Sequence, residues 1–265
     1  MNDRVKKAIK EGQIHAGNIS FAKLREIAGQ DYGIIVWNQL GRGTNILCTQ
    51  EQLNQYLYSY GPMTKYQWNH FLKQVEIPEG RVRIIDYGCG QGLADALLFD
   101  FKGRDFLNRV ESVVLIEPSK IALSRASAVL ECYLNEVTID SNRADLVTIH
   151  KKLDDLTLDE LGSIEGINNI HIFSNVLDIP NFNHFNLFQK ILQNNGLHCI
   201  LAVSHSRSFH GGDDRFKELQ KQINDEKYAS RIRVLKSQID DKLKYNNKTN
   251  LISWELHLEV FNGPV

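Results

Sequence analysis

The sequence lacks several features that would place it in a specialised class of proteins. Among its 265 residues, 31 Lys and Arg balance 32 Asp and Glu, which excludes a globally basic nucleic-acid binder and an acidic disordered tail. Gly and Pro are sparse, at 18 and 5 residues, which excludes collagen-like and low-complexity chains. The longest apolar runs, such as 113–116, are as long as a strand and far shorter than a membrane span.

Cysteine is also scarce and carries no motif. The four cysteines lie far apart without a C-x-x-C pair, which favours neither a zinc ribbon nor a small disulfide framework.

Signals for a metal site and for secretion are missing as well. No strong metal-ligand spacing is formed by His205, His210 and Asp213, so we expect no metal. The N-terminus lacks the apolar core of a secretory signal. We therefore expect a soluble, cytoplasmic protein with no membrane contact.

The chain changes character near residue 80. Residues 1–78 read mainly as helices, and Thr49-x-x-Gln52 forms a capping box ahead of a helix at 53–60. Beyond residue 79, β-branched runs alternate with helix-length segments, which predicts an α/β fold whose parallel sheet is covered by helices. The expected strands are 82–85, 113–116, 146–149, 170–173 and 197–203.

The C-terminal part contains one clear strand and one ambiguous stretch. From Ile252 to Val260 apolar and polar residues alternate, which predicts a strand with one polar face. In 229–243, the apolar residues fit either a helix or a short strand starting at Ile232. Periodicity alone leaves that stretch open.

The sharpest motif is the run from Ile84 to Gly92, IIDYGCGQG. An apolar strand leads into three glycines at alternate positions and then into a helix. Glycines at this spacing let the backbone turn tightly and approach a ligand, and the helix N-terminus offers free N–H groups. The turn therefore predicts a cofactor site. A dinucleotide fingerprint would need glycine at position 93, where this chain has leucine, so a pyrophosphate-containing cofactor is less favoured.

An acidic residue ends the next predicted strand. Glu117 follows the apolar run 113–116 and lies 25 residues beyond Gly92. A carboxylate at this place can accept hydrogen bonds from both hydroxyls of a ribose, and the spacing is near that of a nucleoside-binding βαβ unit.

Together these two motifs resemble those of the class I S-adenosylmethionine-dependent methyltransferases. The resemblance implies a seven-stranded, mostly parallel, doubly wound sheet over 79–265, with the helical segment 1–78 covering the cofactor cleft. It also implies a sixth strand near 230–236 and an antiparallel last strand. The cofactor S-adenosylmethionine is then expected to contact residues of the glycine turn and of the next strand end, namely Asp86, Tyr87, Gly88, Cys89, Gly90, Gly92, Glu117 and Pro118.

Two further loops match the family by position. The loop after the third strand offers Leu153 and Asp154 as adenine contacts, and the loop after the fourth strand offers Asn175. Ligands of such sheets sit at the carboxyl ends of strands. The fourth-strand loop is not the Asn/Asp-Pro-Pro-Tyr motif of methyltransferases that act on amide or adenine amino groups, which disfavours that subclass.

No catalytic residue can be read from the sequence, because methyl transfer requires mainly positioning of the acceptor. We expect a methyl acceptor that is a small molecule, an RNA or a protein. Two alternatives remain: a catalytically silent binding or assembly protein with this fold, and a nicotinamide-dependent oxidoreductase. The candidates for a base or an orienting group are Tyr66, His70, Asp178, His205 and His210.

The balanced charge hides two unequal segments. Residues 86–165 carry 8 Lys and Arg against 15 Asp and Glu, whereas residues 215–248 carry 10 against 5. The basic segment is a possible polyanion contact, although a solvated helix face is the favoured explanation.

Overall fold

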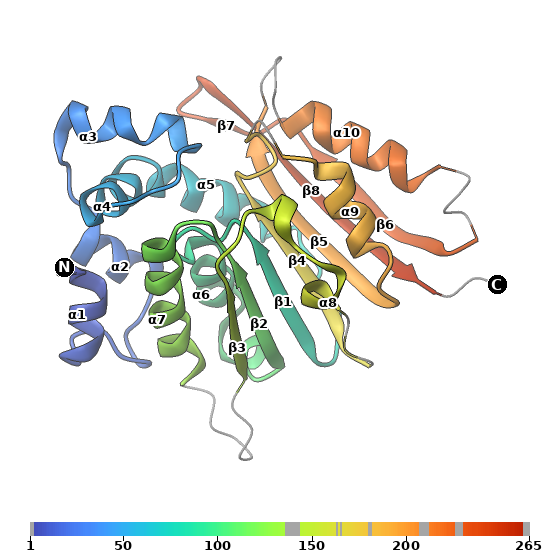
Figure 1. Cartoon of the computed structure of the whole chain (residues 1–265), viewed down its shortest axis with the longest axis horizontal. Coiled ribbons are helices and arrows are strands. Elements are labelled where there is room, and N and C mark those ends of the chain that lie inside the picture. Colours follow the sequence, from blue (N-terminus) through green and yellow to red (C-terminus); the bar gives the residue numbers. More distant parts are fainter. Residues whose placement is uncertain are drawn as a thin grey trace.

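The computed structural model describes residues 3–135, 144–162, 164, 166–179, 182–206, 212–225 and 230–261. Within them one sheet crosses the molecule, with strand order β3-β2-β1-β4-β5-β8-β6, and the short β7 pairs with β8 (Figure 1). The strands are β1 Val82–Tyr87, β2 Val110–Ile116, β3 Asp145–Ile149, β4 Asn168–Ser174, β5 Gly196–His205, β6 Ile232–Asp240, β7 Lys244–Tyr245 and β8 Thr249–Val260.

The strand directions confirm the α/β fold and resolve the ambiguous stretch. β1 is parallel to β2 and β4, and parallel pairing continues to β3 on one side and β5 on the other. β8 runs antiparallel to both β5 and β6. The segment 232–240 is therefore a strand, and the last long strand is antiparallel, as the family resemblance predicted.

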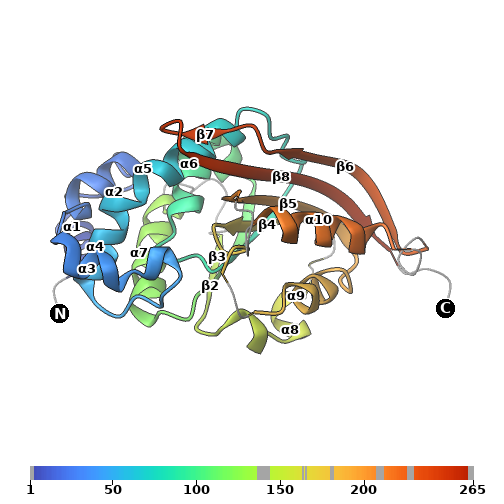
Figure 2. The same cartoon turned by 90° about the horizontal axis from the view of Figure 1, so that it is seen from above.

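Both faces of the sheet are buried. Neighbouring residues of one strand belong to different cores: Ile84 and Val113 pack in one, whereas Ile85 and Val114 pack in the other. Parallel strands covered on both sides have such continuous apolar runs. Helices α6 Leu93–Leu107 and α7 Lys120–Leu134 cover the first face, and α8 Leu158–Leu161, α9 His184–Ile191 and α10 Gly212–Ile223 cover the second (Figure 2).

The N-terminal segment forms five helices next to α6 and α7, and the last of them also packs against β5 and β8 (Figures 1 and 2). The predicted capping box is present, since Thr49 accepts from the N–H of Gln52 and the Gln52 side chain accepts from that of Thr49. No helix in the described part of the chain is long and apolar enough to cross a membrane. The helices are α1 Arg4–Lys10, α2 Phe21–Ala28, α3 Gly33–Gln39, α4 Gln50–Ser59 and α5 Gly61–Phe71.

The predicted polar face of β8 is more enclosed than its pattern indicates. Glu255 is fully buried. Its carboxylate accepts hydrogen bonds from His257, from Lys236 on β6 and from the backbone N–H of Glu76 after α5. A buried carboxylate is tolerated where several donors surround it. The alternation predicts the strand correctly, but it does not show that the segment after α5 packs over the polar side.

Candidate functional site

The glycine turn after β1 uses each of its three glycines differently. All have positive φ, at +70° for Gly88, +55° for Gly90 and +74° for Gly92, a region that L side chains rarely adopt. A Cβ on Gly88 would meet Val176 at 2.9 Å, and one on Gly92 would meet Leu130 of α7 at 2.9 Å. A Cβ on Gly90 would meet no described atom within 4 Å, because Gly90 borders an open cavity.

Glu117 connects the end of β2 to this turn. Its two carboxylate oxygens accept from the backbone N–H of Gly90 at 3.0 Å and of Ser119 at 2.8 Å. Burial raises the pKa of Glu117, although these hydrogen bonds oppose the rise. A carboxylate has about four acceptor sites, so two backbone bonds leave capacity for ligand hydroxyls. The sequence predicts the ribose role of Glu117, but it does not reveal this second role in shaping the turn.

Two buried carboxyl groups lie beneath the turn. Asp86 at the end of β1 and Asp95 on α6 are both fully buried, and their oxygens have no hydrogen-bond partner elsewhere among the described residues. Burial and mutual repulsion raise the pKa of Asp86 well above its usual range, which favours one proton shared by the pair. Burial and these acids also raise the pKa of Cys89, so its thiol stays protonated and is no nucleophile.

A cavity of about 320 Å³ opens between the carboxyl ends of the strands and the N-terminal helices. That volume is within the range of small-molecule sites. Eight of the predicted cofactor residues line it, namely Gly88, Cys89, Gly90, Glu117, Pro118, Leu153, Asp154 and Asn175. The residues that sequence reasoning missed are Gly43, Thr44, Asn45, Ile46, Leu47, Tyr56, Thr64, Gln91, Leu93, Ala94, Ala122, Lys152, Ser174, Val176, Ile179 and Phe182.

Helix α5 fixes the loop after β4. Asn175 has a φ of +55°, and its side-chain amide forms two reciprocal hydrogen bonds with that of Gln67, at 3.0 and 3.2 Å. The indole N–H of Trp68 donates to the Ser174 hydroxyl at 2.9 Å. The N-terminal segment therefore holds a wall of the cavity in place and contributes residues 43–47, Tyr56 and Thr64 to its lining.

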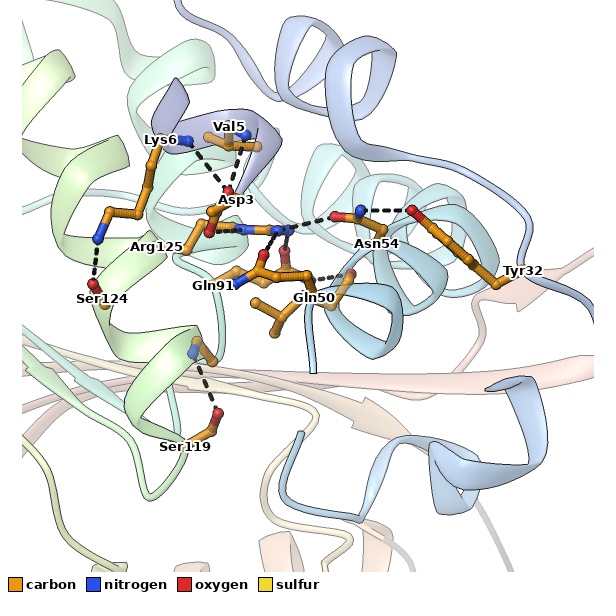
Figure 3. Close-up of polar contacts among 12 residues, drawn as sticks. Asp3, Val5, Lys6, Tyr32, Gln50, Asn54, Gln91, Ser119, Ser124 and Arg125 are labelled. Carbon is orange, nitrogen blue, oxygen red and sulfur yellow. Dashed lines mark hydrogen bonds and ion pairs between the residues drawn. The ribbon is translucent and has the colours of Figure 1, made fainter. Parts of the chain in front are cut away.

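A buried arginine ties the same segment to the glycine turn (Figure 3). Arg125 of α7 donates to Asp3 at 3.0 Å, to Gln91 of the turn at 2.7 Å, and to Gln50 and Asn54 of α4 at 2.6 and 2.9 Å. Its side chain is 1% exposed. Asp3 caps α1, so one guanidinium joins α1, α4, α7 and the turn.

The structure places the other predicted residues away from the cavity wall. Tyr87 is buried, where its hydroxyl lies 3.0 Å from Nδ1 of His171. Tyr66 is exposed beside Tyr245, and His70 lies 3.2 Å from Asp240, so neither lines the cavity. Asp86 and Gly92 support the turn from behind, Asp178 and His205 line an adjoining recess, and His210 lies outside the described residues.

Part of the basic charge in 215–248 has internal partners. Lys236 pairs with Glu255 and Glu76, Arg233 pairs with Glu259, and Arg215 donates to two backbone carbonyls. These contacts lower the charge that this segment can offer to a polyanion, and the polyanion contact stays a prediction.

The charges around the glycine turn favour a cationic ligand. Among the described residues, Glu117 and Asp154 line the cavity with one cationic side chain, Lys152, and Asp86 and Asp95 lie behind the turn. A dianionic pyrophosphate would face this acidic set, whereas a ligand with a sulfonium and an ammonium group suits it. The open space at Gly90 and the acceptor capacity of Glu117 also fit an adenosyl cofactor.

No family model and no curated protein matches the chain. Solved structures with a similar fold include Trm5b from Pyrococcus abyssi, at 13% identity over 76% of this chain with a TM-score of 0.44. The chain spans about half of that protein, covering 49% of it.

Two further structures are similar at the same level. One is an S-adenosylmethionine-dependent methyltransferase from Leishmania major, at 14% identity over 89% of this chain and 91% of that chain, with a TM-score of 0.45. The other is TYW2 from M. jannaschii in complex with AdoMet, at 11% identity over 74% and 76%, with a TM-score of 0.45. The strand order and the antiparallel β8 give the chain the fold of class I methyltransferases.

Proposed function

We propose that the protein is an S-adenosylmethionine-dependent methyltransferase. The observation that supports this most strongly is the acidic, glycine-rich wall of the cavity at the carboxyl ends of β1 and β2. In a dinucleotide site the pyrophosphate lies at a G-x-G-x-x-G turn, whereas this turn has Leu93 in place of the last glycine and the buried carboxyl groups of Asp86 and Asp95 behind it.

In this proposal each strand end holds a different part of the cofactor. Glu117 accepts from the ribose hydroxyls, Leu153 and Pro118 border the adenine, and the backbone of 88–90 lies along the methionine portion. The bound cofactor supplies a methyl group on a positively charged sulfur, which makes it ready for displacement by a nucleophile. The chain orients the acceptor and excludes water, for which the N-terminal residues 43–47 form the cover.

Calorimetry on the intact chain tests the cofactor. We expect S-adenosylmethionine and S-adenosylhomocysteine to bind, and NAD not to bind. Glu117→Gln should weaken the binding of both adenosyl compounds. Glu111→Gln is its matched control and should leave the binding unchanged, because Glu111 lies on β2 but pairs with Arg81 at the surface, outside the cavity. Binding of NAD in place of the two adenosyl compounds would refute the proposal.

A further inference from the structure

A narrow recess adjoins the cofactor cavity where β4 and β5 end. It shares five lining residues with the cavity, Gly43, Thr44, Tyr56, Thr64 and Asn175. Its volume is about 10 Å³, which is the scale of one water-sized group. The recess is completed by Arg42, Tyr60, Met63, Asp178 and His205.

Asp178 and His205 form a buried pair in this recess. Nδ1 of His205 lies 3.1 Å from Oδ2 of Asp178, and the two side chains are 10% and 7% exposed. When Nδ1–H donates to this carboxylate, Nε2 of the neutral ring is left with its lone pair. Among the described residues, the geometry gives His205 the form that a general base requires.

Both partners are held by the surrounding backbone. Arg215 of α10 donates to the carbonyls of Leu177 and Ile179, at 2.8 and 2.7 Å, and so brackets Asp178 on both sides. His205 is the last residue of β5 and pairs in register with Leu251 of β8. Ordered supports of this kind keep a catalytic side chain in one geometry.

Four other titratable groups at the cavity either stay protonated or are already hydrogen-bonded. Burial and the charge of Asp178 raise the pKa of Tyr56, so its hydroxyl stays protonated. Cys89 stays a thiol for the same physical reason. Glu117 and Asp154 already accept backbone hydrogen bonds, from Gly90 and Ser119 and from Asn183.

The strand order places this pair at the carboxyl edge of the sheet, beside the loop after β4. Along the carboxyl edge of the sheet, Glu117 follows β2, the glycine turn follows β1, Asn175 follows β4 and His205 ends β5. A cofactor held at β2 and β1 therefore has the recess at its β4 side. Resting on the proposed function, we infer that His205 is the general base for the methyl acceptor and that Asp178 positions it.

The step balances without another reactant. An acceptor oxygen or nitrogen gives its lone pair to the methyl carbon, and the carbon–sulfur electron pair returns to sulfur, which becomes a neutral thioether. The acceptor's proton passes to Nε2 of His205, and the Asp178 carboxylate stabilises the imidazolium. Because the recess holds a single small group, the acceptor presents a terminal hydroxyl or amine there, while its remaining atoms stay in the wider cavity.

The tautomer of His205 gives a test that does not depend on activity. In ¹⁵N NMR of protein labelled in its histidine rings, the His205 signals, assigned with His205→Gln, should show a protonated Nδ1 and a bare Nε2 in the neutral form. Asp178→Asn should raise the population of the other tautomer. Asp240→Asn is the matched control, since Asp240 pairs with His70 at 3.2 Å outside the recess. A His205 ring protonated at Nε2 in the unmodified chain would overturn the inference.

Kinetics test the same pair. The probe is an extract of the source cells, incubated with methyl-labelled S-adenosylmethionine. His205→Gln should slow transfer by about 10²-fold or more and abolish the rise of rate with pH, while leaving S-adenosylhomocysteine affinity in calorimetry unchanged. The charged or titratable groups that the described part of the chain places around this ring are Asp178, Tyr56, Tyr60, Arg42 and Arg215. The pH profile is therefore compared in Asp178→Asn and Asp240→Asn.

The outcomes separate the inference from the proposed function. The inference would be overturned, and the proposed function would stand, if His205→Gln kept its transfer rate and its cofactor affinity within threefold and its pH profile were unchanged. An unmodified chain that binds no S-adenosylmethionine, or binds it and labels nothing in the extract, would overturn both.

Discussion

Arg125 offers a sharp test of how the N-terminal helices and the glycine turn are joined. The substitution Arg125→Met keeps the aliphatic length and removes the guanidinium. Asp3 then loses its only charged partner in Figure 3, and oxygens of Gln50, Asn54 and Gln91 lose charge-assisted donors.

The size of the effect follows from burial. Removing one partner of a buried ion pair costs about 3–5 kcal/mol, because the remaining charge is left uncompensated. Asp3 keeps the N–H groups of Val5 and Lys6 as donors, which argues for the lower half of that range. In a chain of this size a loss of about 3–4 kcal/mol lowers Tm by roughly 6–16 °C.

Thermal and urea unfolding measure this cost. Arg81→Met is the control, because the Arg81 to Glu111 pair is 61% and 37% exposed, and exposed pairs contribute about 0–1 kcal/mol. Asp3→Asn combined with Arg125→Met should cost less than the sum of the single changes, since both remove one interaction. An Arg125→Met protein as stable as Arg81→Met would refute the reasoning.

Three further predictions concern the turn and the sheet. Gly90→Val should abolish S-adenosylhomocysteine binding in calorimetry, because the valine side chain enters the open cavity. The fold should stay intact, at a backbone strain of about 1–2 kcal/mol for φ +55°. Retained binding would place the cofactor elsewhere. Glu117→Ala should weaken that binding by about 1.5–3 kcal/mol, or at least tenfold, and also lower Tm, since Gly90 and Ser119 lose their acceptor; unchanged affinity would contradict the ribose role. Burial lowers the pKa of His198 to about 4, below the unfolded value of about 6.5. Between pH 6.5 and 4 the unfolded chain takes up a proton at this residue and the folded chain does not, so the free energy of unfolding should fall by about 3 kcal/mol. His198→Gln should flatten that part of the curve of unfolding free energy against pH, and an unaltered curve would count against the assignment.

The sequence predicts those parts of the site that depend on local backbone. The glycine turn requires positive φ at Gly88, Gly90 and Gly92, and only glycine adopts that conformation at low cost, so the motif appears in the sequence. Glu117 can be recognised because an apolar strand ends immediately before it. The strand boundaries follow the apolar runs closely, because parallel strands that are covered on both faces are apolar along their length.

Features that depend on distant contacts could not be read. Residues 43–47 line the cavity because tertiary contacts, such as the Ser119 hydroxyl donating to the carbonyl of Leu47, place them there. Tyr66 and His70 share a helix with Gln67, but they face away from the cavity, and helical spacing does not say which face meets the sheet. The pairing of Asp178 with His205 joins the loop after β4 to the end of β5, and no spacing rule connects these two places.

Transfer of a labelled methyl group tests the central claim most directly. The intact chain is incubated with methyl-labelled S-adenosylmethionine and an extract of the source cells, which is then separated into small molecules, RNA and protein. The account predicts that one fraction gains label, that S-adenosylhomocysteine accumulates in equal amount, and that Gly90→Val abolishes both. A chain that binds the cofactor and yet labels no fraction would contradict the claim that it is a methyltransferase.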